Sequence, residues 1–482
     1  MDCLNIALLG EKTLNTLHLH YLFGTGYPLT LLLAALFIYF GKLFSITDPI
    51  ICVNFMSVLF SSLCIPVFYG LSKKITNSTV ALLSSILFSL SPIFLDVSVY
   101  GINHAPSLFF ILLGFLWLVD FRETRRVRYL WLSAVVFGLA GATCLQDFGL
   151  ISLSICFLYF IDLHNQIPQS KKKSQSPLAW WYLFPFAVIV CSVTFLFHLP
   201  YFLGETKMHY LAQLSAYQEA SVAKDIDNFY LRTIPKIFQY LCIALTPCGL
   251  VMVIIGLWFL AKEKTRLFFF LLLWLIVPLV FLNQTITISP RFLVLVLPPC
   301  VIAISYLFFR FLQINKIFQW SSIILFSLMG MMMLNSIYPI LWLRHKRSLI
   351  TEYALWLKEK TEPNARIISI DISPFITNYS QRVPYPKIYV HASDEEYLEY
   401  KERIEKNLDE GVPIYITWTG LYLYDYKKKY SKLINENFDL ELIGSHLFEG
   451  WNKGPAKEVI IENPLYRLRK KNFLIDSQAI KP

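Results

Sequence analysis

The residues of this chain best suited to chemistry are ionisable groups at the ends of long apolar segments. Asp96 ends one segment, His104 opens the next, and Arg291 opens a later one. An ionisable group at a membrane edge is a functional candidate, because burying it without a partner is costly. The full set of candidates comprises Asp2, His18, His20, Tyr27, Asp96, His104, Asp147, Lys207, His209 and Arg291.

This mixture of side chains suits a reaction on an anionic, lipid-linked substrate at the outer membrane face. A carboxylate would act as a general base on an acceptor or hold a divalent cation, with Mg²⁺ or Mn²⁺ as the candidates. Histidine, lysine and arginine would neutralise a leaving phosphate. Structural interpretations remain open: Asp96 as a helix-end residue, His104 as the first residue of a helix, and Arg291 as an interfacial anchor.

The segments that position these residues are helices long enough to cross a membrane. The 482 residues are 56% hydrophobic, and the mean hydropathy is +0.52. A helix of roughly 20 apolar residues crosses the hydrocarbon layer and satisfies its own backbone. We predict a polytopic α-helical membrane protein with about 10–11 hydrophobic helices. They run approximately over 27–44, 50–71, 79–100, 104–119, 129–145, 148–161, 178–198, 237–261, 267–282, 292–312 and 318–343.

The charge distribution indicates membrane topology rather than nucleic-acid binding. The net charge is +10, but residues 346–482 hold 21 Lys and Arg against 20 Asp and Glu. The excess of positive charge therefore lies between hydrophobic segments, and mostly in alternate connectors, which the positive-inside rule places in the cytoplasm. The long connector 199–236 and the tail then lie outside, although Arg344–Arg347 disagrees with this orientation. All nine cysteines precede residue 301 without metal-ligand spacing.

The tail, residues 344–482, is predicted to form a small soluble α/β domain on the outer face. Residues 348–361 have helical spacing, and 365–371, 387–391 and 412–418 have the composition of short strands. Ser393 precedes an acidic first turn and caps a helix that runs to Leu408. Strands that alternate with helices favour a largely parallel sheet.

Several stretches, in this order, resemble the GT-C superfamily of membrane glycosyltransferases, close to the protein O-mannosyltransferases and aminoarabinose transferases. They are the Pro-Leu-rich entry Gly26–Leu33, the basic connector Gly70–Lys74 with the following helix Ala81–Pro92, and the helix start Pro290–Pro299. The resemblance implies a GT-C-like transmembrane domain over 1–343, in which 1–26 is the remnant of an external loop. It also implies inverting transfer of a hexose or pentose from a polyprenyl-phosphate donor.

Carried over to this sequence, the resemblance makes Asp2 the match for the family's catalytic acid and Arg291 the residue near the lipid phosphate. The sequence departs from the family in two respects: its first transmembrane helix is missing, and Asp147 stands where many members have a basic residue. Three alternatives stay open: the chain starts late, activity has been lost, or residues 27–44 cross the membrane and leave His18 and His20 in the cytoplasm.

The leading hypothesis is an integral-membrane glycosyltransferase of a cell or inner membrane, with a glycan, lipid or protein acceptor. Asp2, Asp96 and His104 are the catalytic candidates, and the remaining candidates would bind substrate. The alternative is a catalytically degenerate membrane protein of the same fold that binds a lipid carrier or a protein partner. A transporter is a third possibility, but it predicts acidic residues near the bilayer midplane rather than at segment ends. The expected partners are the lipid-linked donor, the acceptor and membrane lipids, and no nucleic acid.

Overall fold

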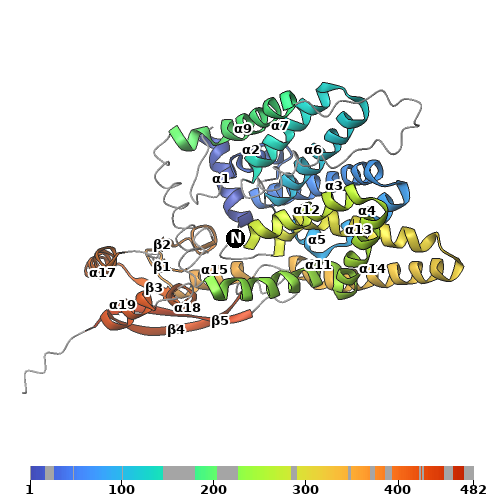
Figure 1. Cartoon of the computed structure of the whole chain (residues 1–482). Helices are drawn as coiled ribbons and strands as arrows, with labels where there is room; N and C mark the ends of the chain where they lie inside the picture. The colour runs from blue at the N-terminus through green and yellow to red at the C-terminus, as the bar shows by residue number, and fades with distance from the viewer. Residues whose placement is uncertain are drawn as a thin grey trace, which may run out of the picture. The chain divides into compact units, whose positions relative to one another are not determined.

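The computed structural model consists of two compact units (Figure 1). Asp2–Leu341 form the membrane unit, and Trp342–Lys453 with Lys457–Pro482 form the C-terminal unit. The structure describes residues 2–16, 27–46, 48–99, 101, 103–144, 180–203, 226–283, 290–345, 349–369, 375–385, 393–422, 425, 428–449 and 460–471.

The membrane unit is helical throughout its described residues. Its elements are α1 (Asp2–Thr16), α2 (Pro28–Leu43), α3 (Pro49–Ile75), α4 (Ser78–Leu90), α5 (Pro92–Val99), α6 (His104–Thr124), α7 (Val127–Thr143), α9 (Trp180–Leu203), α11 (Ile226–Glu263), α12 (Thr265–Asn283), η4 (Pro290–Val296), α13 (Leu297–Leu312) and α14 (Lys316–His345). Five described helices are long and apolar enough to span a membrane, or six if the bent pair α4 and α5 is one span. Four shorter apolar helices accompany them. The prediction of a polytopic helical membrane protein is confirmed, while the segment predicted at 148–161 lies outside the described residues.

Helix α1 lies within the segment 1–26 that was expected as the remnant of an external loop. Asp2–Thr16 form this helix, which packs on α2 and α3. Ile6, Ala7 and Leu9 are buried, and a Cβ at Gly10 would lie 2.8 Å from the Cβ of Ala34. Polar residues are scattered through this segment, so its apolar residues form no long run in the sequence. They nevertheless form a narrow stripe on one face of the helix, and this stripe is the buried face.

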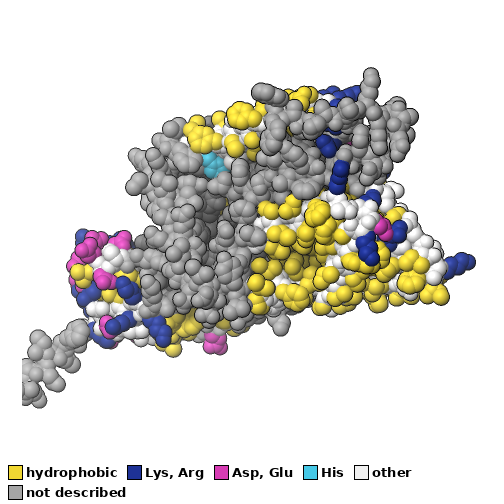
Figure 2. All heavy atoms as spheres, in the orientation of Figure 1, with side chains coloured by type: hydrophobic (Ala, Val, Ile, Leu, Met, Phe, Trp, Pro, Cys, Tyr) yellow, Lys and Arg dark blue, Asp and Glu magenta, His cyan; other side chains and the backbone are white. Residues whose placement is uncertain are grey.

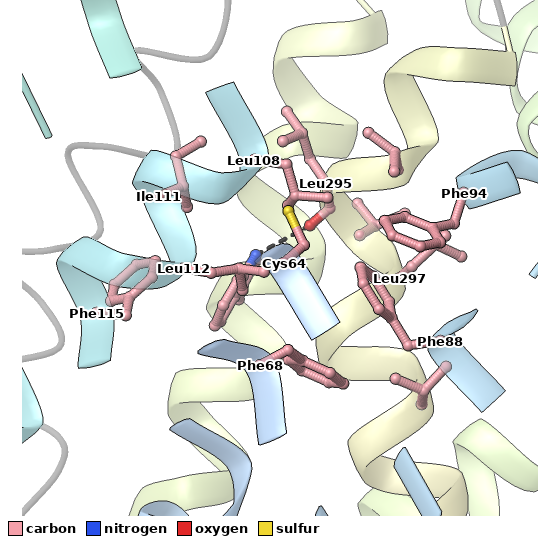
Figure 3. Packing of buried hydrophobic residues seen from close by; sticks show 14 of the residues in the cluster. Cys64, Phe68, Phe88, Phe94, Leu108, Ile111, Leu112, Phe115, Leu295 and Leu297 are labelled. Carbon is pink, nitrogen blue, oxygen red and sulfur yellow. Dashed lines mark hydrogen bonds between the residues drawn. The ribbon is translucent and has the colours of Figure 1, made fainter. Parts of the chain in front are cut away.

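The core of the membrane unit lies where α3, α4, α5 and α6 meet η4 and α13. Cys64 and Phe68 of α3 pack in one buried cluster with Phe88 of α4, Phe94 of α5 and Leu295 of η4 (Figure 3). The ring centroids of Phe88 and Phe94 lie 4.2 Å apart across the α4–α5 bend. Trp274 of α12 is fully buried, and its indole Nε1 donates a 3.0 Å hydrogen bond to the carbonyl oxygen of Leu295. This packing fixes η4 against the helices that surround it.

The outward face of the membrane unit is apolar. Only 22% of the apolar stretch of α14 is buried, and Ile317, Trp320 and Met331 are among its exposed side chains. Figure 2 shows hydrophobic side chains spread over a broad area of the unit, with Lys and Arg near its borders. A face of this kind has the composition of a lipid-facing surface.

The C-terminal unit contains a mixed five-stranded sheet in the order β2-β1-β3-β5-β4. Its elements are α15 (Leu349–Lys360), β1 (Arg366–Ile368), η5 (Ile376–Ser380), β2 (Val383–Tyr385), α17 (Asp394–Asp409), β3 (Ile414–Thr417), α18 (Trp418–Tyr422), α19 (Lys429–Asn437), β4 (Phe438–Glu449) and β5 (Ile460–Lys470). Strand β1 pairs in parallel with β2 and β3, whereas β5 pairs antiparallel with β3 and β4. The prediction of a largely parallel sheet is therefore correct only for the first three strands.

Local signals predicted the helices of this unit better than its strands. Ser393 caps α17 with a capping box, in which its hydroxyl accepts from the Glu396 backbone N–H and the Glu396 carboxylate accepts from the Ser393 N–H. The strand expected at 387–391 lies outside the described residues, and β2 precedes it. Strands β4 and β5 were both missed. For β5 the reason is Pro464, which lacks the donor that a sheet normally requires.

Candidate functional site

Three of the sequence-predicted site residues lie on elements that pack together at one end of the membrane unit. Asp96 is half-buried on α5, His104 is the first residue of α6 and is 1% exposed, and Arg291 is half-buried at the start of η4. Helices α5 and α6 both pack against η4. These residues are far apart in the sequence, yet the elements that carry them pack on one another.

The side chain of Phe292 joins His104 to Arg291. The imidazole of His104 meets the Phe292 ring edge to face, with the ring centroids 5.0 Å apart. The guanidinium carbon of Arg291 lies 5.7 Å from the centroid of the same ring. An aromatic ring attracts both a positively polarised ring edge and a cation, so Phe292 holds the two groups as neighbours. Sequence reasoning did not single out Phe292, whose only signal was its position beside Arg291.

Two helix breaks lie next to this end. Ser91 separates α4 from α5, which are bent by 61° relative to each other, and Pro92 starts α5. Thr246 interrupts α11 with φ 67° and ψ 157°, and its hydroxyl accepts a 3.1 Å hydrogen bond from the Gly249 N–H. The Ser91 hydroxyl donates to the carbonyl oxygen of Ala244 at 3.2 Å, so the two breaks are joined.

These helix breaks are energetically unfavourable in a membrane unless the surrounding protein compensates for them. A helix break frees backbone groups that hydrocarbon cannot satisfy, so it persists only where protein supplies partners or where it lines a polar space. A non-glycine residue at the φ and ψ values of Thr246 is strained, and such strain concentrates at functional sites. The bent helices α5 and α11 lie beside η4, which contacts both.

The connector between α5 and α6 carries two amides that the sequence did not single out. The side-chain oxygen of Asn54, on α3, accepts a 2.9 Å hydrogen bond from the Gly101 N–H and so fixes the connector. Asn103 is 3% exposed, and its amide nitrogen makes no hydrogen bond within the described part of the chain. This buried amide N–H group beside His104 is suited to donate a hydrogen bond to an oxygen of a bound substrate. Isolated amides inside apolar stretches were the available signal.

The remaining sequence-predicted residues are distributed elsewhere or lie outside the described residues. Asp2 opens α1, and the structure describes its backbone position only. Tyr27 is half-buried immediately before α2, where its carbonyl oxygen accepts from the Leu31 N–H at 3.2 Å. Helices α1 and α2 pack on each other and on α3. The other predictions, His18, His20, Asp147, Lys207 and His209, fall outside the described residues.

The described residues do not form a metal site by themselves. Across these residues, no group of three or more His, Cys, Asp or Glu side chains is placed to hold a metal ion. Asp96 and His104 are the described residues near this end that would offer ligands to Mg²⁺ or Mn²⁺, and such an ion commonly takes its remaining ligands from substrate phosphates and water.

The fold matches those of solved membrane glycosyltransferases. The oligosaccharyltransferase of Archaeoglobus fulgidus, in complex with Zn and sulfate, aligns with a TM-score of 0.56 at 13% identity, over 86% of this chain and 63% of that one. ArnT of Cupriavidus metallidurans, bound to undecaprenyl phosphate, aligns with a TM-score of 0.54 at 10% identity, over 97% of this chain and 93% of that one. Both belong to the GT-C superfamily, and this chain has the GT-C fold that the sequence resemblance implied.

Part of the membrane unit also matches a sequence model of one protein family. Residues 26–209 match the model of the dolichyl-phosphate-mannose-protein mannosyltransferases. The archaeal oligosaccharyltransferase AglB from Archaeoglobus fulgidus, in complex with an inhibitory peptide and a dolichol phosphate, aligns with a TM-score of 0.53 at 12% identity, over 98% of this chain and 71% of that one. No curated protein sequence matches the chain.

Proposed function

We propose that this protein transfers a hexosyl or pentosyl group from a polyprenyl-phosphate donor to an acceptor at the outer membrane face. The observation that carries the proposal is the contact of His104 and Arg291 with the ring of Phe292 on η4, against which α5, the helix that carries Asp96, also packs. The family model over residues 26–209 and the polyprenyl phosphates bound to ArnT and AglB support the choice of donor.

In the proposed reaction, an acceptor oxygen attacks the anomeric carbon of the donor sugar. The bond from that carbon to the phosphate oxygen breaks, and polyprenyl phosphate leaves with the bonding electron pair. The Arg291 guanidinium stabilises the charge that develops on the phosphate, because a fixed cation at a membrane edge needs no reorganisation. His104 and Phe292 hold Arg291 in place, and Asn103 donates a hydrogen bond to a substrate oxygen.

The acceptor proton requires a base on the opposite side of the sugar from the leaving phosphate. We assign this role to Asp96, which lies half-buried on α5 beside η4. Asp2 is the second candidate, because the family resemblance points to a carboxylate at the start of the chain. A divalent cation, when bound, would add charge stabilisation at the phosphate. The proposed proton transfer and phosphate departure do not depend on it.

The acceptor side of the proposal follows from chain order. Helices α13 and α14 follow η4 as two successive spans, so the chain leaves the membrane unit on the side from which η4 entered it. We propose that this side is the outer face and that the C-terminal unit lies there. A glycan, lipid or protein acceptor would then meet the donor on the same side as the C-terminal unit.

The test is release of polyprenyl phosphate by the full chain reconstituted in lipid nanodiscs. The donors are polyprenyl-phosphate mannose, glucose and aminoarabinose, each offered with membrane extract as a source of acceptors. We expect release with at least one donor and its loss in Arg291→Ala, Asp96→Asn or Asp2→Asn, according to which carboxylate is the base. Arg310→Ala, at the far end of the α13 span, is the matched control that keeps activity.

Two results would contradict the proposal. Silence of the wild-type protein with every donor, combined with tight binding of polyprenyl phosphate, would instead support a degenerate member that only binds a lipid carrier. Release that is unchanged in Arg291→Ala and in both carboxylate variants would show that the reaction centre lies elsewhere.

A further inference from the structure

The C-terminal unit has a topological feature that marks ligand sites in other α/β sheets. The chain passes from β1 to β2 on one side, and then returns to β3 on the other side of β1. In open α/β sheets, ligands bind outside the carboxyl ends of the parallel strands at such a switch point. Here the switch point lies between the ends of β1 and β3, directly before α18.

The turn at this switch point is held rigidly by buried hydroxyl and amide groups. The Thr417 hydroxyl lies 3.0 Å from the hydroxyls of both Ser369 and Thr419, and it accepts from the Gly420 N–H at 2.9 Å. Asn463, from β5, accepts from the Thr419 N–H at 3.0 Å and donates to the Thr419 hydroxyl at 3.1 Å. A Cβ at Gly420 would lie 2.5 Å from the Ile368 carbonyl oxygen, so the turn passes tightly over β1.

This rigid turn presents two aromatic side chains to solvent. Trp418 is 37% exposed and Tyr422 is 44% exposed, and their ring centroids lie 5.6 Å apart. Their spacing of four residues places both rings on one side of α18. Buried Leu421 anchors the same short helix in the core. We call Trp418 and Tyr422 the aromatic pair.

The aromatic pair differs from an ordinary apolar patch in size and in its surroundings. The exposed aliphatic residues described in this unit, Val383, Leu398, Leu442 and Leu447, lie on β2, α17 and β4 rather than on α18. A surface that docks on lipid or on an apolar helix is larger and continuous. Strand β5 packs on α18 and carries a further phenol, Tyr466, whose pKa is raised by burial and by Tyr422.

We propose that the aromatic pair is a stacking platform for a neutral saccharide. The apolar C–H face of a sugar ring packs on an aromatic ring, while phenol hydroxyls and the indole N–H serve its hydroxyl groups. A rigid turn reduces the ordering cost of binding, so two partly exposed rings suffice for weak, specific contact. The inference rests on the proposed function only in that the bound saccharide would be the acceptor glycan.

The test is saturation-transfer NMR on the full chain in nanodiscs with three trisaccharides: mannotriose, cellotriose and triacetylchitotriose. We expect at least one to bind wild-type protein, and Trp418→Ala or Tyr422→Ala to weaken it about tenfold. Trp418→Tyr keeps a ring and should retain most of the binding. Trp418→Leu keeps apolar area without a ring and should lose it.

Two control variants separate ring stacking from general apolar contact and from the transfer reaction. Leu398→Ala removes a comparably exposed apolar side chain of the same unit and should bind like the wild type. Arg291→Ala should also bind normally, so a failed glycosyl-transfer assay leaves this result untouched. Absence of binding for all three trisaccharides would overturn the proposal. So would full binding by Trp418→Leu, which would indicate an apolar contact with lipid or protein.

Discussion

The two ends of helix α6 surround their ionisable residues in different ways: carboxylates pair with a cation at one end, and an aromatic ring contacts a histidine and an arginine at the other. At its last turn, Lys74 of α3 pairs with Asp120 at 2.8 Å and also contacts Glu123. At its first residue, His104 meets the ring of Phe292 beside Arg291 on η4, and α5, which carries Asp96, also packs on η4. The C-terminal end of α6 thus consists of ion pairs between continuous helices. Its N-terminal end lies beside elements that are interrupted by helix breaks.

A second ion-paired group reinforces the contrast. Glu263, at the end of α11, pairs with Arg310 at 2.9 Å and accepts a 2.6 Å hydrogen bond from the Tyr306 hydroxyl. Arg310 and Arg291 thus occupy the two ends of the η4–α13 span. Cations that pair with carboxylates at helix ends hold spans in register and orient them. A cation placed beside an aromatic ring at a broken end is better suited to receive a substrate phosphate.

The largest effect should come from replacing each of the two arginines of this span in turn. Arg291→Ala should reduce kcat/KM for the lipid-linked donor by at least about a hundredfold, because a preorganised charge partner is lost. Arg310→Ala should change kcat/KM by less than about threefold. Release of polyprenyl phosphate measures both. Equal losses in the two variants would remove the functional distinction between the ends.

Uncoupling the two helix breaks should matter next. Ser91→Ala leaves the Ala244 carbonyl oxygen buried without its donor, which should reduce the free energy of unfolding by about 1–3 kcal/mol. Activity should fall as well, because α5 carries Asp96. Ser89→Ala is the matched control, since its hydroxyl bonds only locally to the Ile86 carbonyl oxygen. Unfolding by SDS titration in mixed micelles measures the difference, and an unchanged midpoint for Ser91→Ala would argue against the coupling.

A smaller effect is expected at the ion-paired end. Lys74→Met removes the ammonium that links α3 to α6 but keeps the aliphatic stem, and should destabilise the membrane unit by about 1 kcal/mol or less. The side chain is 30% exposed, which limits the strength of the pair. Lys73→Met is the control on the adjacent residue. Donor affinity should not change in either variant. A loss of donor affinity in Lys74→Met alone would contradict a purely structural role for the ion-paired end of α6.

The smallest effect lies in the C-terminal unit and depends on pH. Burial raises the pKa of Glu362, but the hydrogen bond from Tyr415 and the charges of Arg467 and Arg382 outweigh burial and hold this pKa below its usual range. Its stabilising contribution is therefore present above about pH 4.5 and is lost as the pH falls through the lower, folded value.

Hydrogen exchange of β1 and β3 in the full chain measures this contribution. Protection in wild-type protein should decrease between about pH 6 and about pH 3, after correction for intrinsic exchange. Glu362→Gln should show a shallower decrease, and Glu359→Gln on α15 serves as the control. Identical profiles for Glu362→Gln and wild type would show that the group contributes nothing measurable.

The sequence predicted helices and their ends well where the signals are local. The cap predicted at Ser393 is present, and Asp48 and Asn77, which were not predicted as caps, accept hydrogen bonds from the Ile50 and Val80 N–H groups in the same way. Long apolar runs left little freedom, because a membrane requires helices. The resemblance of ordered motifs to the GT-C superfamily then indicated the fold of the membrane unit.

The geometry of the candidate site could be predicted only in part. Arg291, His104 and Asp96 were identified from their position at segment ends, but nothing local showed that one Phe292 ring would join two of them. Pro92 and Pro247 are local signals of a helix break, but the segments 79–100 and 237–261 were predicted as continuous. The positive φ of Thr246 depends on tertiary contacts. Asn103 was missed because a single amide between apolar segments has no periodicity to mark it.

Asn463 gives the C-terminal unit an order of assembly. Its carbonyl oxygen accepts from the Tyr353 hydroxyl of α15, 110 residues earlier, while its side chain closes the turn at Thr419, 44 residues earlier. Contacts so distant in sequence form late, since the intervening loops must close first. During synthesis from the N-terminus, the membrane unit and the strands β1 to β4 precede Asn463 out of the ribosome. The aromatic pair therefore reaches its final placement only after the membrane spans have been made.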